Sequence, residues 1–237
     1  MQNRSLIHLG HHHLRSVFAY WLAHRYSFLF YTLFLTLIAA PLLAAFGLVQ
    51  THLMIFVGIN LVAALVGIRR RHFSHVLLIL LFALISIRIV AGSIELQSVI
   101  AASTIALVIL GFIAGIDTVR VAMSSSRVSA ELIYAGLSVY MLVGILFAIL
   151  HWAVGLEWHD AYLLPEGGSL SLHTSMYFSF VTQTTLGLGD VLPKSDLARG
   201  LVMVQAVAGQ LYLAVMVARL VSLYVSSAEK NNEGSST

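Results

Sequence analysis

Residues 172–190 read LHTSMYFSFVTQTTLGLGD, and this stretch decides the fold of the chain. Its first part, Leu172–Gln183, is apolar enough to enter a lipid bilayer but shorter than the about 20 residues that a helix needs to cross one. Such a helix is re-entrant, which is tolerated only where protein or a water-filled cavity surrounds it. Ser171 precedes it and is a candidate N-cap. In the following run, Thr184–Asp190, helix formers give way to alternating glycines.

The two glycines of this run, Gly187 and Gly189, are separated by one residue. For successive backbone carbonyls to point the same way, alternate residues must leave the region normal for L-residues, and glycine does so without steric cost. Rings of such carbonyls can replace the water shell of a dehydrated cation. The negative end of the preceding helix dipole and the carboxylate of Asp190 both attract cations. We therefore expect Thr185–Gly189, here termed the filter run, to bind a cation, with the Thr185 hydroxyl adding a ring at the inner end.

The whole chain is too apolar for a soluble protein. Of its 237 residues, 59% are hydrophobic and 10% are charged, and the mean hydropathy is +0.92, whereas a soluble domain has about 25% charged residues. This composition excludes an ordinary cytosolic enzyme, a disordered chain and a soluble binding module. The lack of cysteine excludes disulfides and thiolate metal sites. A net charge of +3 is too small to indicate nucleic acid, and no signal peptide opens the chain.

Six apolar runs have the length of membrane-spanning helices. None alternates in the manner of a barrel strand, so we predict an all-α membrane protein with six spans, the re-entrant helix and the filter loop. The six runs are Phe28–Val49, Leu53–Ile68, Phe73–Gly92, Ser98–Ile116, Leu132–Val154 and Gly200–Val225.

Arginine and lysine lie in every second connection between these runs, among them Arg69–Arg71 and Arg120, and at both ends of the chain. The long stretch Gly155–Asp196 on the opposite side is mainly acidic. Because short connections rich in Lys and Arg stay inside, we expect both termini to be cytoplasmic in a multi-pass protein of the plasma membrane.

From Leu132 to Val225 the chain resembles the potassium-channel pore family, whose filter is usually written TVGYG. The residues that agree with the family pattern are Thr184, Thr185, Gly187, Gly189 and Asp190, and Leu186 replaces valine conservatively. The resemblance implies a homotetramer in the lipid bilayer with K⁺ as the transported ion and no organic cofactor. It also implies that K⁺ is coordinated by the backbone carbonyls of Thr185, Leu186, Gly187 and Leu188.

Two positions depart from the family pattern. Leu188 stands where the family usually has tyrosine, and Phe178 stands where an aromatic hydrogen-bond donor often backs that tyrosine. We therefore hypothesise a potassium-selective but softer filter that is supported by apolar contact. Tyr177 keeps a hydroxyl that can reach Asp190.

In the sixth run, Gly209 lies where relatives carry a hinge glycine, although glycine is also common where membrane helices pack closely. Four nearby residues share one helical face and are our candidates for the cavity lining. They are Gln210, Leu213, Ala214 and Val217. An intramembrane glutamine favours an aqueous surface.

The first four spans resemble the layout of a voltage-gated channel. The fourth span, Ser98–Ile116, contains neither Arg nor Lys, so we predict weak or no voltage dependence. Arg88 is a charge at buried depth, and Glu95 can pair with it.

The predicted organisation has five parts, and no attached ligand-sensing domain follows the last span. These are a cytoplasmic segment with an interfacial helix (1–27), a voltage-sensor-like domain without gating charges (28–116), a cytoplasmic linker (117–131), the pore domain (132–225) and a short cytoplasmic tail (226–237).

Three other functions stay open. A less selective monovalent cation channel fits the departure at Leu188. A membrane haem or metal protein would use histidines such as His75 and His151, although these fall near opposite membrane edges. A non-conducting scaffold would pass no ions. No convincing catalytic pair is present, so we expect no enzyme. His151, His159 and His173 lie on or near the outer side, where their protonation can tune a pore.

Overall fold

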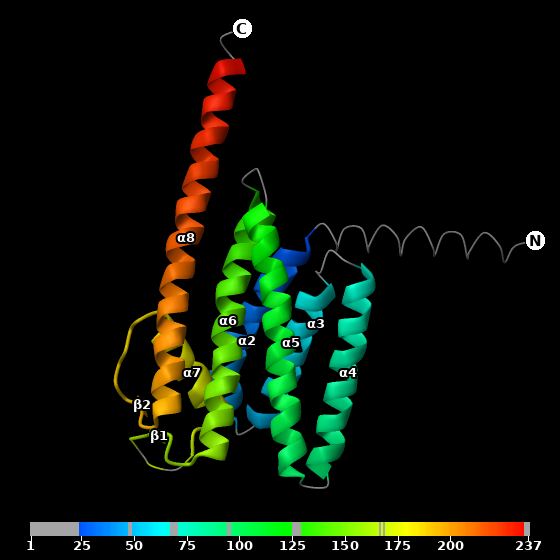
Figure 1. Cartoon of the computed structure of the whole chain (residues 1–237), viewed down its shortest axis with the longest axis vertical. Helices are drawn as coiled ribbons and strands as arrows, with labels where there is room; N and C mark the ends of the chain where they lie inside the picture. Colours follow the sequence, from blue (N-terminus) through cyan, green and yellow to red (C-terminus); the bar gives the residue numbers. More distant parts are fainter. Residues whose placement is uncertain are drawn as a thin grey trace, which may run out of the picture.

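The chain is almost entirely helical in the part that the structure, a computed structural model, describes. That part comprises residues 24–46, 49–66, 71–93, 96–124, 129–165, 167 and 169–234. Within it lie seven α-helices and one pair of short strands, arranged as a bundle of long helices (Figure 1). The elements are α2 (Arg25–Ala45), α3 (Val49–Val66), α4 (Arg71–Ser93), α5 (Gln97–Ser124), α6 (Ala130–Glu157), β1 (Tyr162–Leu163), α7 (Leu172–Gln183), β2 (Leu192–Pro193) and α8 (Asp196–Gly234).

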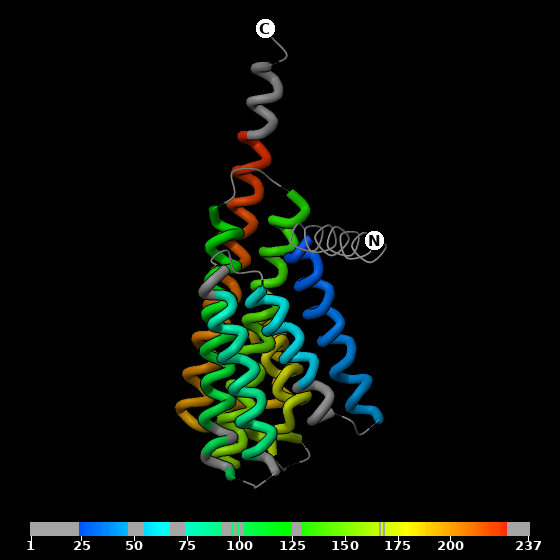
Figure 2. The backbone as a smooth tube through the Cα atoms, turned by 90° about the vertical axis from the view of Figure 1, so that its right-hand side faces the viewer, coloured from blue at the N-terminus to red at the C-terminus, as the bar shows by residue number. Residues whose placement is uncertain are grey.

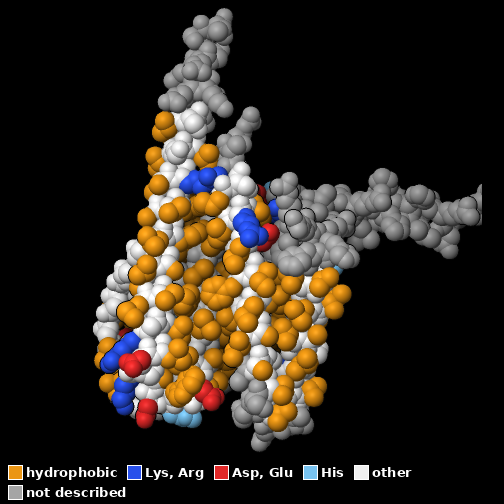
Figure 3. Space-filling view, viewed as in Figure 1, with side chains coloured by type: hydrophobic (Ala, Val, Ile, Leu, Met, Phe, Trp, Pro, Cys, Tyr) orange, Lys and Arg blue, Asp and Glu red, His pale blue; other side chains and the backbone are white. Residues whose placement is uncertain are grey.

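Five helices of the described part, α2, α4, α5, α6 and α8, are long and apolar enough to cross a membrane. In α3, the apolar stretch Ile55–Val66 is shorter, so the count of six spans stays a prediction. Charged side chains gather at the end of the bundle where β1 and β2 lie and again at the level where α5 and α6 end on the opposite side, and they leave a hydrophobic band over α4, α5, α6 and α8 between them (Figure 3). These features indicate an all-α membrane protein.

Helix α6 is the centre of the bundle and packs against α2, α5, α7 and α8. It is apolar all round, as expected of a helix that is buried on every side. Its start is fixed by Ser129, whose side chain accepts a hydrogen bond from the backbone N–H of Leu132. The glutamate that follows, Glu131, accepts from the backbone N–H of Tyr26 at 3.0 Å and from the hydroxyl of Ser27, and so joins α6 to the start of α2.

Helix α7 lies between α6 and α8, at the end of the bundle opposite to the C-terminus of the chain (Figure 1). The strands β1 and β2, which come before and after α7, pair antiparallel with Tyr162 opposite Pro193. The backbone N–H groups of Lys194 and Ser195 add hydrogen bonds to the carbonyl of Ala161. The loop around α7 is therefore closed at its base, which places α7 and the filter run in one compact unit.

Two helices continue beyond the apolar runs that predict them, because a helix does not end where its apolar residues end. Helix α5 continues to Ser124, into the segment 117–131 predicted as a cytoplasmic linker, and α6 begins at Ala130. The tail predicted for 226–237 is helical up to Gly234. Helix α8 has 39 residues, or about 58 Å at 1.5 Å per residue, which exceeds a hydrocarbon core of about 30 Å. It extends beyond the other helices in both views (Figure 1, Figure 2).

The N-terminal segment predicted for 1–27 lies outside the described residues up to residue 23, and α2 begins at Arg25. Glu95 also lies outside the described residues, so its pairing with Arg88 stays a prediction. Arg88 itself, on α4, donates a hydrogen bond to the hydroxyl of Thr104 on α5. Its guanidinium carbon lies 5.8 Å from the centre of the Trp152 ring on α6, so Arg88 links α4 to both α5 and α6.

Candidate functional site

Helix α7 has the bounds that the sequence predicts, Leu172–Gln183. Ser171 is its N-cap, because the Ser171 side chain accepts a hydrogen bond from the backbone N–H of Thr174 at 3.2 Å. The helix is close to α6 at Gly144, where a Cβ atom would lie 2.6 Å from the ring of Phe180. A side chain at position 144 would push α7 away from α6, so the glycine sets this close approach.

The C-terminal end of α7 is a Schellman motif. The backbone N–H of Leu186 donates to the carbonyl of Val181, and that of Thr185 donates to the carbonyl of Thr182, each at 3.0 Å. The residue in the left-handed position of this motif is Thr185, with φ of +58°, where glycine is usual. A β-branched residue in this conformation costs roughly 1–2 kcal/mol. The filter run therefore starts with strained backbone.

The filter run alternates regularly in backbone conformation. Thr185, Gly187 and Gly189 have φ of +58°, +56° and +79°, while Leu186 and Leu188 between them lie outside the positive-φ region. The sequence predicts this conformation at the two glycines. It gives no signal for Thr185, because threonine rarely adopts positive φ.

One face of the filter run is exposed and has few contacts with the rest of its own chain. The side chains of Leu186 and Leu188 are 62% and 60% exposed. A Cβ atom at Gly187 or Gly189 would meet no atom within 4 Å. Any partner for this face of the run must come from outside the chain.

Behind the filter run, the last residue of α7 is bound on several sides. The Gln183 side chain is fully buried and donates to the carbonyl of Tyr140 at 2.7 Å. The Gln183 carbonyl accepts from the Tyr140 hydroxyl and from the Gln210 carboxamide, each at 3.3 Å. A Cβ atom at Gly209 would lie 2.8 Å from the Gln183 Cγ and 3.0 Å from its carbonyl oxygen. Helices α6 and α8 therefore meet α7 at Gln183.

These contacts place two of the predicted gate residues. Gly209 packs against α7, and Gln210 reaches the end of α7, within a helix that runs unbroken from Asp196 to Gly234. Leu213 is half-buried, and Ala214 and Val217 are exposed in the single chain. The hinge and the cavity lining stay predictions.

A second group of polar side chains lies further along the same face of α7. His151 is fully buried, with Nδ1 2.7 Å from the Tyr162 hydroxyl and Nε2 3.0 Å from the Gln205 Oε1 atom. The Gln205 carboxamide in turn donates to the carbonyl and the hydroxyl of Ser179. The sequence predicts His151 near the outer side but not its partners, which are distant along the chain.

Phe178 and Leu188, the two residues that depart from the family pattern, lie in different surroundings. Phe178 is on the buried side of α7, and its ring lies edge-to-face against His151 at 5.0 Å and against Tyr162 at 5.6 Å between ring centres. Leu188 lies at the exposed surface of the filter run. Phe178 therefore packs against His151 and Tyr162 and takes no part in the surface of the filter run.

Asp190, which follows the filter run, is held in place by two donors. The Tyr177 hydroxyl donates to its carboxylate at 2.5 Å, and the backbone N–H of Val191 donates at 3.0 Å. The hydrogen bond from Tyr177 lowers the pKa of Asp190 below its usual value. A negative charge is therefore maintained at this end of the filter run.

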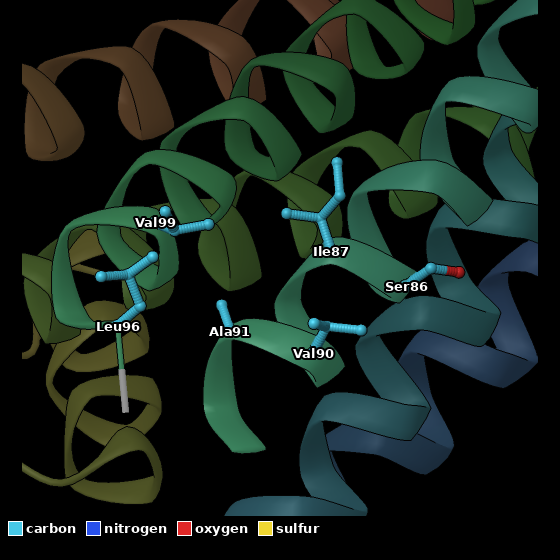
Figure 4. Close-up of a pocket in the computed structure, with 6 residues that line it drawn as sticks. All are labelled: Ser86, Ile87, Val90, Ala91, Leu96 and Val99. Carbon is cyan, nitrogen blue, oxygen red and sulfur yellow. The ribbon is translucent and has the colours of Figure 1, made fainter. Parts of the chain in front are cut away.

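A hollow of about 310 Å³ lies at the surface of α4, near the start of α5, and is almost wholly apolar (Figure 4). Its residues are Ser86, Ile87, Val90, Ala91, Leu96 and Val99. The hydroxyl of Ser86 donates to the carbonyl of Phe82 in the same helix. Among the described residues that line the hollow, no polar group is arranged for an ion or a polar substrate.

Across the described ranges, no three His, Asp or Glu side chains lie together in a way that could hold a metal ion. Comparison with known protein families matches residues 139–226 to a family described as an ion channel. No curated protein and no solved structure matches the chain. The matched segment contains α7, the filter run and most of α6 and α8, so the site lies inside it. The match supports an ion channel.

Proposed function

We propose that the chain is the subunit of a potassium-selective channel in which four copies surround one axis. The observation that carries this proposal is the alternation of positive φ at Thr185, Gly187 and Gly189, directly after a short capped helix. Such alternation turns successive carbonyls toward one side of the backbone, where they can replace the hydration shell of K⁺. In the proposed channel, K⁺ is the transported ion and is bound by the carbonyls of residues 185–188 and by the Thr185 hydroxyl.

The exposed surface of the pore half supports the assembly into a homotetramer. Leu186 and Leu188 are more than half exposed in one chain, and so are Val207, Leu211 and Val215 on one face of α8. Contiguous exposed apolar side chains indicate an interaction surface. In the proposed tetramer, the other three copies and the bilayer cover these residues.

The acidic side of the protein supports the proposed orientation. Asp190 keeps its charge through the hydrogen bond from Tyr177, and a negative charge at a pore mouth raises the local concentration of cations. In the plasma membrane this mouth faces outward, with both termini in the cytoplasm. The proposal includes no enzymatic step, organic cofactor or nucleic-acid partner.

A less selective cation channel is the second candidate, because two residues of the filter pattern lack the usual side-chain hydrogen bond. Neither Leu188 nor Phe178 has a side-chain donor, and Phe178 is turned to the far side of α7. The third alternative, a haem or metal protein, is disfavoured at His151, because each of its ring nitrogens lies at hydrogen-bond distance from a side chain.

The test is potassium flux into liposomes that contain the purified protein, with Gly187→Ala and Gly167→Ala compared. Both glycines have positive φ, +56° and +70°, and neither has an atom within 4 Å of a built Cβ. The two substitutions therefore impose similar backbone strain, about 1–2 kcal/mol. We expect loss of flux for Gly187→Ala and normal flux for Gly167→Ala.

Two further measurements complete the test. The reversal potential in mixed potassium and sodium separates the selective channel from the less selective one. The native mass of the purified oligomer gives the number of copies. A protein that passes no potassium, or that is not fourfold, contradicts the proposal.

A further inference from the structure

Polar side chains from four elements meet in the interior of the pore half. His151 (α6), Ser179 (α7) and Gln205 (α8) are fully buried, and Tyr162 (β1) is 5% exposed. Burying such groups is costly unless each has a hydrogen-bond partner, and polar residues at membrane depth are rare for this reason. All four have partners here, and those partners are one another.

The chemistry of the partners gives this chain of hydrogen bonds a direction. The carbonyl of Ser179 can only accept, so the amide nitrogen of Gln205 faces it at 3.0 Å and the amide oxygen faces His151. His151 must therefore carry its proton on Nε2, because the Gln205 oxygen can only accept. A neutral imidazole then has a bare Nδ1, which accepts from the Tyr162 hydroxyl at 2.7 Å. Burial raises the pKa of Tyr162, which keeps this hydroxyl protonated as a donor.

This series of hydrogen bonds ends at acceptors on α7, the proposed pore helix. Gln205 donates to both the carbonyl and the hydroxyl of Ser179, at 3.0 and 2.6 Å, and its amide nitrogen lies 3.3 Å from the Gln183 side-chain oxygen. The Ser179 hydroxyl itself donates to the carbonyl of Gly144 on α6 at 2.6 Å. Ser179 and Gln183 are one helical turn apart, and Gln183 is the last residue before the Schellman turn at Thr184 and Thr185.

We propose that His151 and Gln205 are positioning residues for the filter run. They fix α7 between α6 and α8 from behind, and so maintain the filter geometry where Leu188 and Phe178 offer no hydrogen bond of their own. This inference rests on the proposed function as a potassium channel. In this inference, the hydrogen bonds that hold the filter in place are made on the side of α7 that faces α6 and α8.

Five variants test the inference in the whole chain reconstituted in liposomes. His151→Phe keeps an aromatic ring without nitrogen, and Gln205→Met keeps the side-chain length without an amide. Each leaves buried polar partners unsatisfied, and we expect each to lower the potassium-to-sodium permeability ratio roughly tenfold. The matched control is Tyr212→Phe, which removes another hydrogen bond between α8 and α6, from the Tyr212 hydroxyl to the Gly136 carbonyl at 2.7 Å.

The control separates positioning from general stability. Tyr212→Phe is expected to lower the melting temperature of the oligomer while leaving the permeability ratio unchanged, because it does not contact the His151–Gln205 chain. His151→Gln has a carboxamide with a donor group and an acceptor oxygen. It is expected to keep most of the wild-type potassium-to-sodium permeability ratio that His151→Phe loses. Because His151 and Gln205 act in series, the double variant should be no less selective than the worse single variant.

Each result is decisive for the inference. Wild-type-like permeability ratios in His151→Phe and Gln205→Met overturn it, and so does an equal loss in Tyr212→Phe. If His151→Phe does not assemble, Gln205→Met decides in the same way by comparison with Tyr212→Phe: a wild-type-like ratio in Gln205→Met overturns the inference. A wild-type protein that passes no potassium instead overturns the proposed function, which distinguishes the two failures.

Discussion

Gly209 on α8 offers a quantitative test of how α8 packs against α7. A Cβ atom at this position would lie 2.8 Å from the Gln183 Cγ and 3.0 Å from the Gln183 carbonyl oxygen. Neither atom can move away easily, because the Gln183 side chain is fully buried and donates to the Tyr140 carbonyl at 2.7 Å. Gly209→Ala must therefore separate α8 from α7 or distort the end of α7.

The magnitude follows from two opposing effects. Overpacking a well-packed site costs about 1–3 kcal/mol, and replacing glycine by alanine inside a helix returns about 0.5–1 kcal/mol. At the midpoints of these two ranges the net destabilisation is about 1 kcal/mol for each chain. For a chain of this size, that lowers the melting temperature by roughly 2–4 °C.

The matched control lies on the same helix. A Cβ atom at Gly200 would meet no atom within 4 Å, so Gly200→Ala should only gain helix stability, and its melting temperature should rise slightly. The assay is the melting temperature of the detergent-purified oligomer, followed by size exclusion after heating, together with potassium flux. Gly209→Ala as stable as Gly200→Ala would refute the packing argument. A pure hinge role for Gly209 predicts altered opening without loss of stability, so the two measurements separate the two roles.

Three further predictions concern charged groups of the chain. Tyr177→Phe removes the donor that lowers the pKa of Asp190, so the carboxylate should lose its charge at a higher pH. When the outer solution is acidified, single-channel conductance should therefore fall at a higher pH than in the wild type, and an unchanged midpoint of conductance against pH would contradict this. Glu131→Gln keeps one acceptor for the start of α2 but loses the charge, which should lower the melting temperature by the equivalent of about 1–2 kcal/mol; equal melting temperatures would exclude that role. The charged residues of α5 are Asp117 and Arg120 alone, both near its end, so open probability should change little with voltage, and a steep dependence in patch recordings would disprove it.

The sequence predicts the ends of α7 well because specific residue types mark both of them. A capping serine at position 171 starts the helix, and glycine spacing from Gly187 marks the segment beyond its end. The ends of α5 and α8 could not be predicted from the apolar runs. Hydropathy reports which residues can lie in lipid, and it falls at Asp117 although helix-forming residues continue the helix. Membrane depth and helix length are different quantities.

The polar chain behind α7 could not be predicted from spacing. His151 and Gln205 are 54 positions apart, and their contact depends on how α6 and α8 pack around α7. Each residue read alone has an ordinary explanation, such as an outer-edge histidine that senses pH. Only the packed structure places both ring nitrogens of His151 against specific partners.

Thr185 is the position where local preference and proposed function oppose each other. Glycine would occupy the left-handed position of the Schellman motif without the roughly 1–2 kcal/mol that threonine costs there. The hydrogen bonds from Leu186 and Thr185 back to Val181 and Thr182 offset part of this strain. Strained backbone persists where the surrounding structure over-determines it, often at functional sites. Under the proposed function, the strain has a reason: the hydroxyl of Thr185 is an oxygen ligand that glycine cannot supply. The front of the filter run is exposed in one chain. In the proposed tetramer its geometry therefore depends on α7 behind it and on the other copies in front.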